Sequence, residues 1–136
     1  MQTTFTIDTN GPGLYEFTDR VADWTAGHGD GLLTLFVQHT SCSLLIQENA
    51  DPKVQDDLQS YFHRLVPPAT DAKMAYLTHT LEGSDDMPAH IKAAMLPTSL
   101  HIPVISGALK LGTWQGIFIF EHRTRPHARS VVAHLP

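Results

Sequence analysis

The chain has 136 residues, of which 42% are hydrophobic, and its formal net charge is −5 when the histidines are neutral. This length is typical of one domain, so we expect residues 1–136 to fold as a single unit. No apolar run approaches the roughly 20 residues that a membrane-spanning helix needs. The acidic balance and the scattered basic residues argue against nucleic-acid binding, which depends on the neutralisation of phosphates.

The cysteine content and the N-terminal pattern give expectations about the compartment. A single cysteine, Cys42, excludes an intramolecular disulfide and a cysteine-cluster zinc site. Residues 1–7 alternate like a strand and lack the basic start and apolar stretch of a signal peptide, so we expect a cytoplasmic protein. The nine histidines equal the lysines and arginines in number, and histidines that gather in one place serve metal binding or proton transfer near neutral pH.

The N-terminal part predicts strands and one short helix. Thr18 is the expected N-cap of a helix that runs to about Ala26. The apolar, β-favouring runs at 32–38 and 42–47 predict central strands that are buried on both faces. Before them, alternation predicts a strand over 2–8, and the Asn-Gly-Pro-Gly sequence at 10–13 predicts a turn.

Two further helices follow. Asp51 before Pro52 is a typical helix start, and the helix is expected to end before Pro67. Four apolar residues recur at helical spacing and are expected to face inward: Val54, Leu58, Tyr61 (or Phe62) and Leu65. The next helix is capped by Asp85 or Asp86 and ends before Pro97. Its expected inward residues are Ile91, Ala94 and Met95.

The remaining segments predict strands. Residues 76–80 are a candidate short strand, 100–104 alternates, 107–110 is a hairpin turn, 111–121 is a long strand, and 129–135 is the final strand. Strands outnumber helices and do not alternate with them regularly. We therefore expect an α+β domain built on a mostly antiparallel β-sandwich with flanking helices.

Two histidines enclose a short acidic loop. His79 and His90 lie eleven residues apart, with Glu82, Asp85 and Asp86 between them. Imidazole nitrogens and carboxylate oxygens that converge form a divalent-metal site. The alternative is that the two aspartates only cap the helix and that His90 is a surface residue.

His39-Thr40-Ser41 follows a buried strand. A histidine at the boundary of a core needs a hydrogen-bond partner, so His39 is a candidate third metal ligand, a candidate general base, or a satisfied structural histidine. Ser41 and Cys42 lack the Gly-x-Ser-x-Gly context of a nucleophile elbow, which argues against a serine or cysteine hydrolase.

Three more polar positions lie at strand ends. Glu48 and Asn49 precede the Asp51 cap, and a solvated turn does not require both of them. Glu121 ends the long strand, where it faces a site or pairs with Arg123 or Arg125. The Gly112-Thr113-Trp114-Gln115-Gly116 motif lacks the spacing and the lysine of a phosphate-binding loop, and its glycines suggest a bulge or a close backbone approach.

Taken in this order, the motifs resemble the YjbQ-like family, whose members are often described as secondary thiamine-phosphate synthases. The likeness runs from about residue 3 to the end. It rests on a set of separated motifs: His39-Thr40-Ser41, Glu48-Asn49-Ala50-Asp51 with Asp56, Tyr76 and His79, Glu82-Gly83 with Asp86, His90-Ile91-Lys92, Gly107, and residues 112–116. Met87-Pro88 lengthen the acidic loop relative to the family, which leaves open whether Asp85 or Asp86 takes the site position.

The resemblance implies a β-sandwich assembled as a homotrimer, with a cluster of histidines and acids near a subunit boundary. It implies that His39, His79 and His90 face a divalent metal ion, Zn²⁺ or Mg²⁺. Its implied catalytic neighbours are His39, Glu48, Asn49, Asp86 and Glu121.

The implied activity joins a hydroxymethylpyrimidine pyrophosphate to a thiazole phosphate, which gives thiamine phosphate and pyrophosphate. A metal ion suits this reaction because the departing pyrophosphate carries charge. Lys92 and Lys110 are the candidate cations near the motifs for a pyrophosphate group. The alternatives are a metal-dependent hydrolase of a small substrate and a non-catalytic trimeric binding protein.

Overall fold

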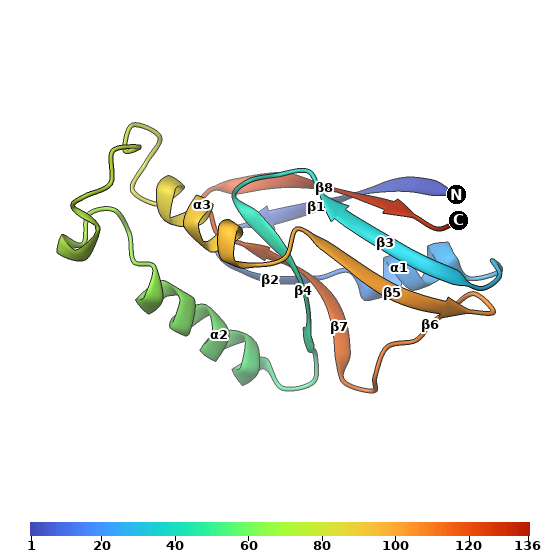
Figure 1. The fold of residues 1–136 in the computed structure, drawn as a ribbon. Helices are drawn as coiled ribbons and strands as arrows, with labels where there is room; N and C mark the ends of the chain where they lie inside the picture. The colour runs from blue at the N-terminus through green and yellow to red at the C-terminus, as the bar shows by residue number, and fades with distance from the viewer.

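The structure is a computed structural model that describes residues 1–136. Two antiparallel sheets pack face to face, with helices at their sides (Figure 1). The five-stranded sheet has the order β1 (Gln2–Asn10), β8 (Pro126–His134), β3 (Gly31–Val37), β5 (Ser99–Ile105) and β6 (Ala108–Leu109). The three-stranded sheet has the order β2 (Gly13–Glu16), β7 (Gln115–Glu121) and β4 (Cys42–Glu48). The expected α+β sandwich is confirmed.

The core lies between the sheets. Leu33 and Leu35 of β3 and Ile117 and Ile119 of β7 are fully buried within one apolar cluster. The core stabilises the fold mainly because it removes apolar surface from water, which contributes about 1.5–3 kcal/mol for each large aliphatic side chain.

The strand predictions were partly wrong. Strand β3 is buried on one face only, because Leu32 and Phe36 are each 49% exposed on the other. Strand β4 is an edge strand rather than a central one. Residues 76–80 form no strand, and β7 begins only at Gln115 because the segment before it is a loop and turn. No helix of the structure is long and apolar enough to cross a membrane.

Helix α1 (Thr18–Thr25) begins without a side-chain cap, contrary to the prediction for Thr18. The Thr18 hydroxyl instead donates to Glu16 Oε2 at 2.7 Å and accepts from the Ile117 N–H at 2.8 Å. This residue therefore joins the start of the helix to β7.

Helix α2 (Pro52–Leu65) starts as predicted, since the Asp51 carboxylate accepts from the Lys53 N–H at 3.0 Å. No residue of α2 is fully buried. Phe62 contacts Phe120 of β7 edge-on at 5.7 Å between ring centroids. Tyr61 and Leu65, two expected inward residues, are 60% and 52% exposed.

Helix α3 (Asp86–Met95) follows a loop that contains a short 3₁₀ helix, η1 (Ala72–Met74). The buried side of α3 carries Asp86, Pro88, Ala89 and Ala93, whereas the expected Ala94 and Met95 are exposed. Figure 1 shows α3 beside the start of β4. A buried aspartate in the first turn of this helix marks the candidate site.

Candidate metal centre

The first two turns of α3 place two polar side chains on one face. Asp86 and His90 are four residues apart, which on an α-helix makes them neighbours along one side. The loop that precedes α3 returns His79 to the same place. The 83–85 turn permits this return, because Gly83 adopts a left-handed φ of 107°.

The three side chains converge on one oxygen. His79 Nε2 lies 2.7 Å from Asp86 Oδ2, and His90 Nε2 lies 3.2 Å from the same oxygen. One potential ligand atom from each residue lies within 4.8 Å of the other two. The Asp86 side chain is 3% exposed and that of His79 is 46% exposed, so one side of this His79–Asp86–His90 cluster opens to solvent.

The orientation of His90 is fixed by the backbone. His90 Nδ1 lies 2.8 Å from the carbonyl oxygen of Thr40, which only accepts, so Nδ1 carries a proton and donates it. In the neutral ring, Nε2 then presents a lone pair toward the Asp86 carboxylate. Nε2 and Asp86 Oδ2 lie 3.2 Å apart, a separation that either a proton between them or a metal ion bound to both satisfies.

The two carboxylate oxygens of Asp86 have different partners. Oδ1 accepts from Arg123 Nη1 at 2.6 Å, which leaves Oδ2 for the two imidazoles. Burial opposes ionisation of Asp86, but its hydrogen bond with His79 and the Arg123 charge together hold its pKa below the ordinary value. Asp86 is therefore an ionised, fixed carboxylate.

Asp85 has other partners, and it is Asp86 that lies beside the two histidines. Its Oδ2 accepts from Arg123 Nε at 2.9 Å and from the Thr124 N–H at 2.9 Å. Asp85 therefore holds Arg123, and Arg123 in turn orients Asp86. A carboxylate that is itself held by a hydrogen bond is a recurrent support of metal ligands.

The donor set of the cluster fits a divalent transition ion. Two imidazoles and one carboxylate with an open side are the protein ligands of many catalytic zinc sites, in which water takes the fourth position. Imidazole nitrogens favour Zn²⁺ over Mg²⁺, which prefers oxygen ligands. Glu82 lies at the exposed rim, where its Oε2 is 3.5 Å from His79 Nε2.

His39 lies outside the cluster. Its Nε2 accepts from the Ser130 N–H at 2.8 Å, which ties the end of β3 to β8. Burial, with a further effect of the Arg129 charge, lowers the pKa of His39. Two of the three expected imidazoles therefore meet, and the geometry of His39 in this chain is that of a structural histidine.

Glu121 also lies away from the cluster, in a buried ion pair. Its carboxylate accepts from Arg129 Nε at 2.7 Å, from the Arg129 Nη2, and from the Thr9 hydroxyl at 2.5 Å. It accepts as well from the N–H groups of His122 and Arg123. The sequence left open whether Glu121 faces a site or pairs with Arg123 or Arg125; its partner in the structure is Arg129.

Glu48 and Asn49 lie at the opposite end of β4 from Thr40. Seven strand residues span roughly 20 Å, so these side chains are remote from the His79–Asp86–His90 cluster within one chain. Asn49 Nδ2 donates to Glu16 Oε2 at 2.9 Å. Gly116 permits this contact, because a Cβ there would lie 3.0 Å from Asn49 Cβ, which confirms the expected close approach.

The supporting arginines were not predicted from the sequence. The sequence predicts Arg123 only as a candidate partner of Glu121, and it predicts no role for Arg129 at a site. Both are more than 90% buried, which is unusual for arginine unless it is paired. The signal available in the sequence was the apolar run at 117–120 shortly before Arg123 and the pair Val131-Val132 shortly after Arg129.

His122 is buried between the three-stranded sheet and helices α2 and α3. This burial makes the stability of the fold depend on pH. Its Nε2 lies 2.9 Å from the Ser43 hydroxyl, and burial, followed by the Lys92 charge, lowers the pKa of His122 to about 3. The unfolded chain binds a proton here below pH 6.5 and the folded chain does not, so stability falls as the pH drops below 6.5.

We expect the free energy of unfolding to be about 2 kcal/mol lower at pH 5 than at pH 7 through His122 alone. Urea denaturation at both pH values measures it. His122→Gln, whose amide still reaches Ser43, should lose less stability over this range, whereas the exposed His101→Gln should behave like the wild type. An equal loss in all three proteins would contradict this origin of the effect.

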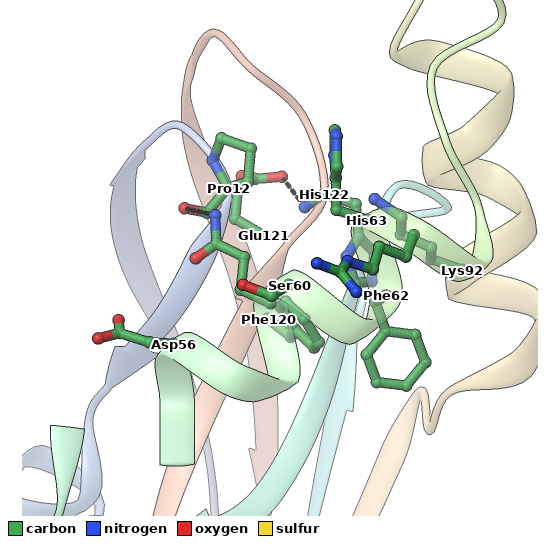
Figure 2. Close-up of a pocket in the computed structure, with 11 residues that line it drawn as sticks. Pro12, Asp56, Ser60, Phe62, His63, Lys92, Phe120, Glu121 and His122 are labelled. Atoms are coloured by element: carbon green, nitrogen blue, oxygen red, sulfur yellow. Dashed lines mark hydrogen bonds between the residues drawn. The ribbon is translucent and has the colours of Figure 1, made fainter. Parts of the chain in front are cut away.

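A separate cavity of about 490 Å³ lies between α2, α3 and β7 (Figure 2). We call it the α2–α3 cavity. Two phenylalanines, Phe62 and Phe120, line it, and the other residues that line it include Asp56, His63, Arg64, Lys92 and His122.

The whole chain matches one family. The model of the family described as "UPF0047 protein YjbQ-like" matches residues 3–136. The UPF0047 protein sll1880 of Synechocystis sp. is 48% identical over 98% of this chain and 90% of its own. The UPF0047 protein YjbQ of Escherichia coli O157:H7 is 42% identical over 98% of this chain and 96% of its own.

Solved structures share the fold. The conserved hypothetical protein TT1486 from Thermus thermophilus superposes with a TM-score of 0.84 at 32% identity, covering 98% of this chain and 99% of that one. The hypothetical protein APE1520 from Aeropyrum pernix gives a TM-score of 0.84 at 27% identity, with 100% and 98% coverage. The chain therefore belongs to the YjbQ-like UPF0047 family.

Proposed function

We propose that this protein is a metal-dependent enzyme that acts on a small phosphate-bearing substrate. The observation that supports the proposal most is the convergence of His79 Nε2 and His90 Nε2 on Asp86 Oδ2. Two imidazoles and one carboxylate that meet on an open side of the molecule are the ligand set of many catalytic zinc sites. A divalent ion in this cluster would stabilise negative charge that develops on a phosphate or pyrophosphate oxygen.

The chain holds the His79–Asp86–His90 cluster rigid and leaves one side of it open to substrate. The Thr40 carbonyl and Arg123 fix His90 and Asp86 before any substrate arrives, so little reorganisation is needed. His79 lies on the preceding loop and is nearly half exposed, which leaves a path for the substrate from solvent.

The specific reaction that we propose is the one implied by the family resemblance. A bond between the pyrimidine methylene carbon and a pyrophosphate oxygen breaks, and a bond between that carbon and the thiazole nitrogen forms. Thiamine phosphate and pyrophosphate are the products. The exposed side of the cluster suits the pyrophosphate, because it is the part of the substrate that gains charge.

A second candidate is hydrolysis of a small phosphoester or related substrate, and Glu82 favours it. This carboxylate is 65% exposed and lies at the rim of the cluster, where it is able to accept a proton from water. The synthase reaction needs no such base, because its nucleophile is a ring nitrogen without a proton.

We further propose that the protein assembles as a homotrimer. Leu32 and Phe36 leave an apolar area on the outer face of β3, and Ile105 of β5 is also half exposed. Exposed apolar surface of this kind is typical of subunit contacts. Light scattering should give three times the chain mass of 15.0 kDa, and a monomer would contradict the proposal.

The function is tested by incubating purified protein with both half-substrates and Zn²⁺ or Mg²⁺. Thiamine phosphate should accumulate with the wild type and the exposed control His101→Gln, and not with His79→Gln. Phosphate release from a panel of phosphoesters without the thiazole, lost in His79→Gln, would favour the hydrolase. Zn²⁺ bound with neither activity would favour the non-catalytic binding protein.

A further inference from the structure

The α2–α3 cavity carries basic side chains that form no ion pair within the chain. Lys92 of α3 and Arg64 and His63 of α2 line it. None of these three side chains takes part in any of the six ion pairs of the structure. By contrast, Arg123 and Arg129, the buried arginines, are fully paired.

The acidic groups near the cavity form no ion pair with these side chains. The Glu121 carboxylate is saturated by Arg129, Thr9 and two backbone N–H groups. Asp85, which lines the adjoining smaller cavity together with Lys92 and His63, is held by Arg123 and Thr124. Figure 2 shows Asp56 at one end of the cavity and His63 and Lys92 at the other.

The cavity is separate from the His79–Asp86–His90 cluster. On an α-helix, residues two positions apart point in nearly opposite directions, so Lys92 and His90 lie on different sides of α3. Asp85, Pro88 and Lys92 share the side that faces the cavities, whereas Asp86 and His90 share the other. None of the three members of the cluster lines the cavity.

We propose that the α2–α3 cavity binds the phosphate group of a small phosphorylated molecule through Lys92, Arg64 and His63. The guanidinium of Arg64 presents paired N–H donors that match phosphate oxygens, and the ammonium of Lys92 supplies a compact charge. Phe62 and Phe120 provide an apolar wall for the rest of the molecule. The volume of about 490 Å³ suits a molecule of this kind.

Inorganic phosphate and pyrophosphate are the probes for this site. Calorimetric titration of the purified protein should detect binding, and Lys92→Gln and Arg64→Gln should each weaken it about tenfold, because each removes a charge-assisted hydrogen bond. Ser60→Trp should also weaken binding, since it fills the cavity without changing the charge. Lys53→Gln, an exposed site on the same helix as Arg64, should bind as the wild type does.

The outcomes separate this site from the metal centre. His79→Gln should leave phosphate binding intact; its loss there would mean that phosphate binds at the metal, and would overturn the proposal. Equal binding by Lys92→Gln, Arg64→Gln and the wild type, or no binding at all, would also overturn it. If activity is found, a raised KM in Arg64→Gln assigns the phosphate to the substrate, and an unchanged KM assigns it to a separate effector.

Discussion

Asp86→Asn is expected to lower the affinity of the protein for Zn²⁺ by about 100-fold or more, because even loss of a residue that supports a metal ligand costs about 10–100-fold. The substitution replaces the only anionic member of the His79–Asp86–His90 cluster with a neutral amide. The amide oxygen still accepts from Arg123, so the fold around the site should persist. Competition with a chromophoric chelator measures the affinity, and circular dichroism checks the fold.

Two further variants make this result decisive. His79→Gln removes a ligand from an exposed loop and should weaken Zn²⁺ binding without a fold defect. Asp57→Asn, an exposed acid on α2, should bind as the wild type does. If Asp86→Asn and His79→Gln both retain wild-type affinity, then the cluster is not the metal centre.

Glu121→Gln should cost about 3–5 kcal/mol of stability, which is the typical result of leaving one partner of a buried ion pair uncompensated. Glu121 is fully buried and Arg129 is 3% exposed, so neither charge has access to water. The free energy of unfolding from urea denaturation measures the loss. Arg125→Met, an exposed arginine four residues before Arg129, should change stability by less than about 0.5 kcal/mol.

A double variant separates the pair from the rest of the network. Glu121→Gln with Arg129→Met should lose less than the sum of the two single losses, because the two side chains no longer leave each other unpaired. If the two single losses of stability simply add in the double variant, the ion pair is not the origin of the loss. Burial opposes ionisation of Glu121, but Arg129 and Thr9 lower its pKa, so its stabilisation is present above the ordinary pKa of a glutamate and is lost as the pH falls through the lowered value.

The fold followed from the sequence where local chemistry was decisive. Asp51-Pro52 specified the start of α2, and the alternation over 2–8 specified β1, because capping and strand periodicity are short-range effects. The apolar run at 32–38 predicts a strand that is buried on both faces, which is wrong because Leu32 and Phe36 are exposed on one face. Which face of a strand is covered depends on partners distant in sequence.

The nearness of His79, Asp86 and His90 was predictable, whereas their supports and the positions of the other candidate residues were not. The spacing of Asp86 and His90 on a helix was visible, and so was the proximity of His79. The positions of His39, Glu48 and Glu121 depend on the pairing of β4 with β7. They also depend on a partly buried hydrogen bond from Ser130 to His39 and a buried one from Arg129 to Glu121. These two hydrogen bonds join residues that are 91 and 8 positions apart, and no pattern in the neighbouring sequence predicts them.

The central claim is that one metal ion is bound by His79, Asp86 and His90. The most direct measurement is a crystal structure of the protein grown with Zn²⁺, with anomalous data collected at the zinc edge. The account predicts an anomalous peak about 2.0–2.2 Å from His79 Nε2, His90 Nε2 and Asp86 Oδ2. A peak at other residues, with these three atoms bound to no metal, would contradict it.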